Sequence, residues 1–191
     1  MDILTILAII ILAIAFLIII TQKEFRKVKI VFWPSVTAVF ITAVIKSIFL
    51  YSGWANNSFT RSFLPPYNSI NYFLLYSGFK FFFPYFLSLA VASLFIFWMK
   101  SANRKRGNIF FEKEEPYLAG LGIFLSGHPG WMIYLLTVVF CYLIIHLFQR
   151  LKRIKNKRVP LYHLWIPVGL FVILINAFWL SRCSWWLLLK L

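Results

Sequence analysis

The stretch "FFEKEEPYLAGLGIFLSGHPG", residues 110–130, places three glutamates directly before a short apolar segment. As a helix, residues 116–127 would be roughly 18 Å long, whereas a helix that crosses the ~30 Å core of a bilayer needs about 20 residues. Glu112, Glu114 and Glu115 are three of only five acidic residues in the chain. The fold therefore has to accommodate both an unusually short apolar helix and a scarce acidic cluster.

The composition identifies the environment of the chain. Of its 191 residues, 62% are hydrophobic and only 13% are charged, whereas soluble domains carry about 25% charged residues. The net charge of +15 is also compatible with binding nucleic acid. However, the basic residues lie in short runs between apolar segments, which is typical of membrane topology. We therefore expect an integral membrane protein whose partner is the lipid bilayer, with no nucleic-acid partner.

Apolar runs of about 18–21 residues predict transmembrane helices. We expect an all-α, polytopic protein with a single membrane domain over residues 1–191 and about six spans, one of them short: 3–20, 30–50, 81–99, 116–127 (the short one), 131–148 and 161–180. The first segment lacks a basic leader and a small-residue cleavage site, so we interpret it as a retained span.

The distribution of basic residues predicts the orientation. Fifteen of the twenty lysines and arginines lie in the segments 21–29, 100–113 and 149–158. Six crossings place these segments on one side, and the positive-inside rule makes that side cytoplasmic. We therefore expect a multi-pass protein of the cell membrane with both termini outside.

Two regions are predicted to lie at the outer interface. Segment 51–80 is aromatic and polar without a strong period, so we expect a loop there. The C-terminal tail carries Trp185 and Trp186, which we expect at the membrane surface because Trp favours headgroup depth. Asn176 is a polar residue inside the last span, and we expect it to form an interhelical hydrogen bond.

The acidic cluster has two interpretations. Pro116 suits the first turn of a helix, and acids near a helix start interact favourably with the macrodipole, so the glutamates can simply begin a helix. Alternatively, Glu24 and either Glu114 or Glu115 lie on the same membrane face under the predicted topology. Two carboxylates brought close together share a proton and can activate water for peptide hydrolysis. The residues alone leave both interpretations open.

The order of features along the chain resembles the membrane domain of type IV prepilin peptidases, the aspartyl proteases that trim pilin leaders at the cytoplasmic face. Three stretches are similar to regions of that family: "KEFRKVKIVFWPSV" (23–36), "FEKEEPYLAGLGIFLSG" (111–127) and "RVPLYHLWIPVGL" (158–170). The similarity runs over residues 3–180, nearly the whole chain, and rests on order and texture.

The resemblance implies a site and a substrate. Residues 111–114 align with the Gly-x-Gly-Asp motif of the family, which is not retained, and Glu114 stands at the position of its second catalytic Asp. Glu24 is the nearest acid to the first Asp. The implied activity is cleavage of leader peptides from a membrane-anchored, pilin-like substrate, with Glu114, Glu24 and Glu115 as the candidate catalytic residues and with no cofactor or metal. The departures also allow an inactive relative.

Two further alternatives remain. Glu114 and Glu115, followed by His146 and His163, resemble the pattern of membrane metalloproteases of the CAAX-processing type, although Ala119 occupies the place of their usual Arg. The other alternative is a non-enzymatic membrane scaffold or complex subunit. Its basic loops would bind anionic lipid or an acidic partner, since each basic residue near such a surface adds ~1 kcal/mol.

Overall fold

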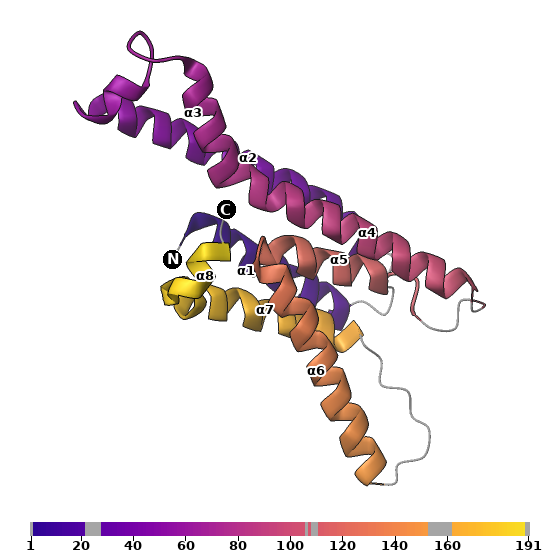
Figure 1. Ribbon diagram of the computed structural model, residues 1–191. Helices are drawn as coiled ribbons and strands as arrows, with labels where there is room; N and C mark the ends of the chain where they lie inside the picture. Colours follow the sequence, from indigo (N-terminus) through magenta and orange to yellow (C-terminus); the bar gives the residue numbers. More distant parts are fainter. Residues whose placement is uncertain (1, 22–27, 106, 108–110, 153–161, 190–191) are drawn as a thin grey trace.

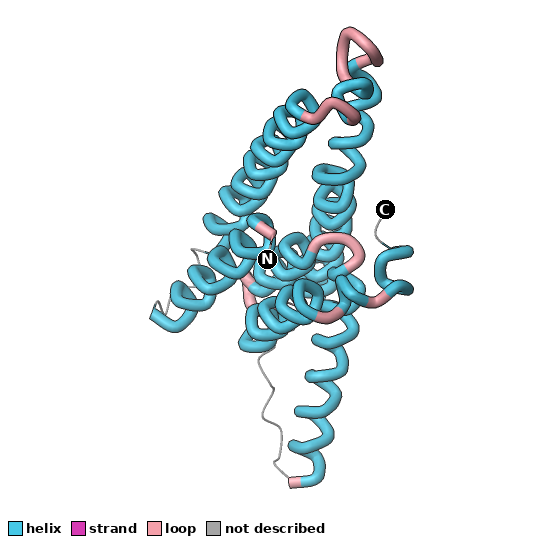
Figure 2. The backbone as a smooth tube through the Cα atoms, turned by 90° about the vertical axis from the view of Figure 1, so that its left-hand side faces the viewer, coloured by secondary structure: helices cyan, strands magenta, loops and turns pink. Residues whose placement is uncertain are grey.

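The computed structural model describes residues 2–21, 28–105, 107, 111–152 and 162–189. These residues form helices joined by short connections, and no strand occurs among them (Figures 1 and 2). The long helices are α1 (Ile3–Thr21), α2 (Val28–Asn56), α4 (Phe83–Lys105), α6 (Gly130–Leu151) and α7 (Tyr162–Phe178). The shorter ones are α3 (Ile70–Ser77), α5 (Glu115–Ser126) and α8 (Ser184–Leu189). The predicted all-α class is confirmed.

Five helical stretches of the described chain are long and apolar enough to cross a membrane. They are Ile3–Ile20, Ile30–Asn56, Ile70–Lys105, Gly130–Leu151 and Leu164–Arg182. Their outward faces carry many exposed large apolar side chains, such as Phe97 and Leu136. Water-soluble proteins rarely expose so much apolar surface. Together with the short α5, these helices give the architecture of a polytopic membrane protein with about six spans.

Helix α5 lies at the centre of the bundle, in contact with α1, α2, α4, α6 and α7 (Figure 1). Every residue from Leu118 to Ser126 is buried. Pro116 lies in its first turn, where a missing N–H costs nothing. The helix ends at Gly127, whose φ of 63° lies in the left-handed region that favours glycine. Because neighbouring helices cover α5 on all sides, it does not need the length of a lipid-facing span.

The close approach of helices around α5 depends on Gly122. A Cβ atom at Gly122 would overlap the ring and hydroxyl of Tyr134, a fully buried residue of α6. The Tyr134 hydroxyl donates a hydrogen bond of 3.0 Å to the backbone carbonyl of Trp165 on α7. Tyr134 therefore packs against α5 and donates a hydrogen bond to α7. This packing requires glycine at position 122, because any side chain there would overlap the tyrosine ring.

The region 51–80 differs from the expected loop. Helix α2 continues to Asn56, a short 3₁₀ turn covers Thr60–Phe63, and α3 runs through a π-helical turn, Gly78–Phe82, directly into α4. The α2–α3 end projects from the bundle (Figure 1). Its centre is Trp54, which packs against the rings of Phe63 and Tyr72. Contacts between aromatic rings, which carry no sequence period, order this segment.

The C-terminal tail also differs from the prediction in one respect. Trp186 was expected at the surface, but it is only 2% exposed. Its indole N–H donates a hydrogen bond of 2.9 Å to the Asn176 side-chain oxygen. The hydrogen bond expected for Asn176 is therefore present, and it joins α7 to α8. The side chain of Trp185 lies outside the described part of the structure.

Candidate functional site

The acidic cluster lies at the beginning of α5, and its three glutamates have different surroundings. Glu112 is exposed, Glu114 is half-buried, and Glu115 is buried. Glu114 is the residue that caps α5, although its side chain makes no capping hydrogen bond. The burial of the three glutamate side chains therefore increases along the chain, from Glu112 through Glu114 to Glu115.

The Glu115 carboxylate is held by two N–H donors. Oε1 accepts a hydrogen bond of 3.0 Å from the indole Nε1 of Trp165, and Oε2 accepts one of 3.2 Å from the backbone N–H of Glu112. The Glu115 N–H in turn donates to the Glu112 carbonyl, a reciprocal arrangement similar to a capping box. Glu115 therefore ties the start of α5 to α7.

Glu115 precedes the apolar segment 116–127, and burial there has an electrostatic cost. Desolvation raises the pKa of its carboxyl, and the hydrogen bonds from Trp165 and Glu112 oppose that rise only in part. A neutral carboxyl is therefore favoured over a wider pH range than in an exposed glutamate.

Glu114 differs from Glu115 in the hydrogen bonding of its side chain. Its Oε2 atom is buried and has no hydrogen-bond partner among the described residues. A buried polar atom without a partner is uncommon in folded proteins, and a catalytic role is one explanation for it. Glu24, the other half of the predicted carboxylate pair, lies outside the described residues. The pairing of Glu24 with Glu114 therefore stays a prediction.

Polar contacts from α4 hold the approach to α5. The buried Asn103 side chain donates to the Phe111 carbonyl at 2.8 Å and accepts from its N–H at 3.0 Å. Further along, Lys100 Nζ donates to the Tyr117 hydroxyl at 2.7 Å and lies 4.1 Å from the centre of its ring. The glutamates therefore stand on a connection that is fixed at both ends.

Sequence reasoning missed these partners. Trp165 lies 50 positions after Glu115, and an isolated Trp near the end of a span is usually interfacial, so nothing in the local pattern paired them. Asn103 directly precedes the basic run 104–106 and resembled an ordinary solvated residue. The one available signal was Lys100 at the end of an apolar run, where lysines reach toward the interface.

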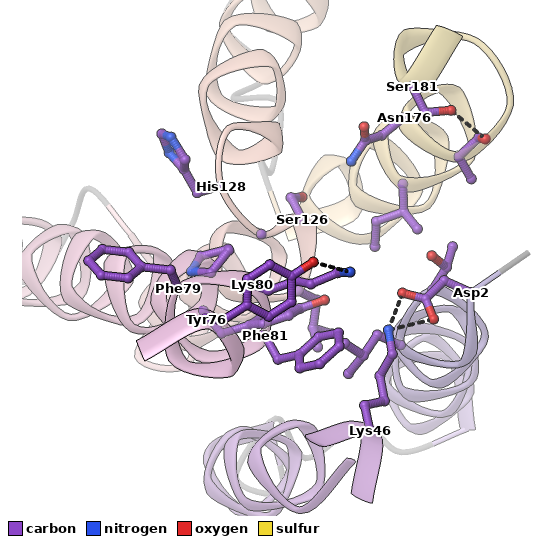
Figure 3. A pocket seen from close by; sticks show the side chains of 18 of the residues that line it. Asp2, Lys46, Tyr76, Phe79, Lys80, Phe81, Ser126, His128, Asn176 and Ser181 are labelled. Atoms are coloured by element: carbon purple, nitrogen blue, oxygen red, sulfur yellow. Dashed lines mark hydrogen bonds and ion pairs between the residues drawn. The ribbon is translucent and has the colours of Figure 1, made fainter. Parts of the chain in front are cut away.

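A cavity of about 880 Å³ lies at the other end of α5, where the helix stops at Gly127 (Figure 3). Asp2 and Lys46 form an ion pair of 2.6 Å at its edge. Lys80, His128 and Asn176 also line it. The sequence did not predict this cavity, because it forms between the ends of helices that are far apart along the chain.

The metal site expected from the metalloprotease pattern has no set of ligands among the described residues. No group of three or more His, Cys, Asp or Glu side chains within the described part of the chain is placed to hold a metal ion. His146 stacks on Tyr142, with ring centres 6.2 Å apart. The side chain of His163 lies outside the described part.

Comparison with models of known protein families, with curated proteins and with solved structures finds no match to this chain.

Proposed function

We propose that this chain is a membrane peptidase of the carboxylate type, which cleaves a membrane-anchored, pilin-like peptide at the basic end of the bundle. The observation that carries the proposal is the Oε2 atom of Glu114 at the start of α5, which is buried and has no hydrogen-bond partner within the described part of the chain. That oxygen can still accept a hydrogen bond from a water molecule or a substrate group.

The chemistry needs two carboxyl groups, one ionised and one protonated, as in aspartic proteases. We assign these roles to Glu114, which stands at the second catalytic position of the resembled family, and to Glu24, the nearest acid to the first. The ionised carboxylate removes a proton from water, whose oxygen attacks the peptide carbonyl carbon. The protonated carboxyl donates its proton to the carbonyl oxygen. Collapse of the tetrahedral intermediate then transfers a proton to the leaving amine and breaks the C–N bond.

We assign Glu115 to positioning rather than to proton transfer. Both of its oxygens already accept hydrogen bonds from N–H donors, so neither is free to bind water in the same arrangement. By fixing α5 to Trp165 on α7, Glu115 sets the direction in which the neighbouring Glu114 side chain leaves the helix. Displacements of ~1 Å at a catalytic group can cost ~100-fold in rate.

The second candidate is a non-enzymatic scaffold or complex subunit with a basic membrane face. The hydrogen bonding of Glu115 favours the scaffold, because each of its carboxylate oxygens accepts an N–H bond at the start of α5 and the side chain therefore has a structural role. The Lys100–Tyr117 contact also supports it, because a cation held beside the start of α5 would attract anionic headgroups or an acidic partner. In this candidate, the acidic cluster has no chemical role.

The test is cleavage of a pilin-like precursor co-expressed with the protein, followed by gel mobility and mass spectrometry of the product. Loss of a general acid or base costs about 10²–10⁴-fold in rate, so Glu114→Gln and Glu24→Gln should each reduce cleavage by at least about 100-fold. Glu112→Gln is the matched control, because Glu112 is an exposed member of the same cluster and should leave cleavage unchanged.

Two results would contradict the proposal. If the Glu114→Gln variant cleaved the precursor at the rate of the unaltered protein, Glu114 would not be a catalytic residue. Absence of any cleavage by the unaltered protein, at a membrane abundance equal to that of an active peptidase control, would favour the scaffold. Each variant's abundance in the membrane is measured in parallel, so that loss of protein is distinguished from loss of activity.

A further inference from the structure

The cavity beyond the C-terminal end of α5 exists because that helix is short. α5 has only 12 residues, so it fills the bundle from its basic end and stops partway, while the longer helices continue past it. The space of about 880 Å³ that remains is bordered by the start of α1, by α2, α3 and α4 with the turn Gly78–Phe82, and by the end of α7 (Figure 3). Its volume lies within the ~300–1,000 Å³ of small-molecule sites.

The walls of the cavity are mainly apolar, with several polar residues among them. Leu4, Phe79, Pro84, Leu125 and Ile173 contribute apolar surface. This combination of a broad apolar wall and a few polar groups is typical of sites that orient an amphiphilic ligand.

The charges at the edge do not cancel. Asp2 is the one described acid that lines the cavity, and it is engaged by Lys46 at 2.6 Å. Lys80 has neutral contacts: Nζ donates to the Tyr76 hydroxyl at 3.1 Å and lies 5.7 Å from the ring centre of Phe81. The cavity therefore has a surplus positive charge at Lys80.

His128 is a further polar residue that lines the cavity. The Nδ1 atom of His128 is buried and has no hydrogen-bond partner among the described residues. Its side chain points away from Lys80 (Figure 3), so Lys80 is the group at the cavity that we expect to bind a phosphate oxygen. Asn176 contributes less, because its side-chain oxygen already accepts from Trp186.

The depth of Lys80 identifies the kind of anion. Lys80 and Lys100 bracket the apolar segment 81–99 on one continuous helical stretch. Twenty residues of helix rise about 30 Å, the thickness of the hydrocarbon core. When Lys100 lies at one boundary of the bilayer, Lys80 therefore lies at the opposite boundary, at the depth of lipid phosphates.

We propose that this cavity binds one anionic phospholipid, with its phosphate against Lys80 and an acyl chain along the apolar wall. The proposal needs only that the chain crosses a bilayer. It is independent of peptidase activity, because the cavity lies at the end of α5 away from Glu114. It also differs from general attraction between basic loops and a membrane, because one lipid is held in a defined site.

The test uses the full chain purified in detergent, with dioleoylphosphatidylglycerol and dioleoylphosphatidylcholine as probes that differ only in their headgroups. Native mass spectrometry counts the lipid molecules retained per chain. The unaltered protein should retain one phosphatidylglycerol in preference to phosphatidylcholine. One cation near such a headgroup is worth about fivefold in affinity, so Lys80→Gln should reduce that preference about fivefold. Arg61→Gln is the control, because Arg61 lies on the same projecting end but does not line the cavity.

Two further arms separate the sources of the signal. Ala177→Phe places a large side chain in the cavity wall without altering charge, so it should abolish retention of the lipid while the protein still elutes as a single species. Glycerol 3-phosphate alone should not raise the melting temperature. Equal retention of both lipids, equal effects of Lys80→Gln and Arg61→Gln, or full stabilisation by glycerol 3-phosphate would each overturn the proposal.

Discussion

The two ends of α5 are built in opposite ways. At its start, the buried Glu115 carboxylate has a donor for each oxygen, and Asn103 fastens the preceding segment with two hydrogen bonds. At its end, a cavity of about 880 Å³ opens, lined by Lys80 and by His128, whose Nδ1 has no described partner. A helix can thus be rigidly held at one end while leaving room for a ligand at the other.

The difference indicates where each kind of substitution acts. At the closed end, polar atoms are shielded from water, so removal of one partner leaves another unsatisfied. At the open end, polar groups keep access to water or headgroups, so their loss is compensated by solvent. The predictions below measure this contrast as free energies of unfolding of the detergent-solubilised protein, from the largest expected effect to the smallest.

The largest effect is expected for Gly122→Leu. The new side chain would occupy the space of the buried Tyr134 ring, and overpacking of this kind costs about 3 kcal/mol. Thermal unfolding monitored by circular dichroism measures the loss. The matched control is Gly53→Leu, because nothing lies within 4 Å of a Cβ atom at Gly53. Similar losses for the two variants would show that the packing of α5 does not limit stability.

Glu115→Ala should cost less, about 2 kcal/mol, because it leaves the buried indole N–H of Trp165 without an acceptor. Denaturant titration followed by tryptophan fluorescence reports both the stability and the environment of the indole. Glu112→Ala removes an exposed member of the same cluster and should change stability by less than about 0.5 kcal/mol. Equal effects would mean that the closed end is not held by Glu115.

The pH dependence of stability should come next. Burial raises the pKa of Glu115 above its unfolded value, so the folded state binds the proton more tightly than the unfolded chain. Stability should therefore decrease as pH rises from about 4.3 through the raised folded value. Glu115→Gln, which cannot ionise, should flatten this slope. Unfolding curves measured across that pH window for both proteins test the prediction, and parallel slopes would contradict it.

The smallest effect is expected for Asp2→Asn at the open end. The Asp2–Lys46 pair has a short separation of 2.6 Å, but the Asp2 side chain is 51% exposed, and exposed pairs contribute about 0–1 kcal/mol. Melting temperatures at low and high salt measure the contribution, which salt should screen further. A loss as large as that of Glu115→Ala would erase the contrast between the two ends.

Hydropathy was sufficient to predict the helical class, because apolar runs of span length have few alternatives in a bilayer. α5 was recognisable as a short segment, since Pro116 lies in its first turn and Gly127 directly follows its last residue. The helical structure within 51–80 was not recognisable, because ring contacts around Trp54, rather than a repeating apolar face, order that region.

The candidate site was predictable only in part. The cluster of Glu112, Glu114 and Glu115 stood out because acids are rare in this chain. Their separate environments depend on Trp165, which is brought to Glu115 by the packing of α5 against α7. Such a contact has no signature in either local segment. The burial of Trp186 was missed for the same reason, since its partner Asn176 lies on the preceding helix.

The complete enclosure of α5 has a consequence for how the protein is assembled in the bilayer. A segment of twelve residues is too short to span the hydrocarbon core as an independent helix, and its terminal backbone groups would meet lipid unpaired. α5 becomes stable only when its neighbours surround it. We therefore expect the long helices to insert into the bilayer first and α5 to insert last, once the neighbouring helices can surround it.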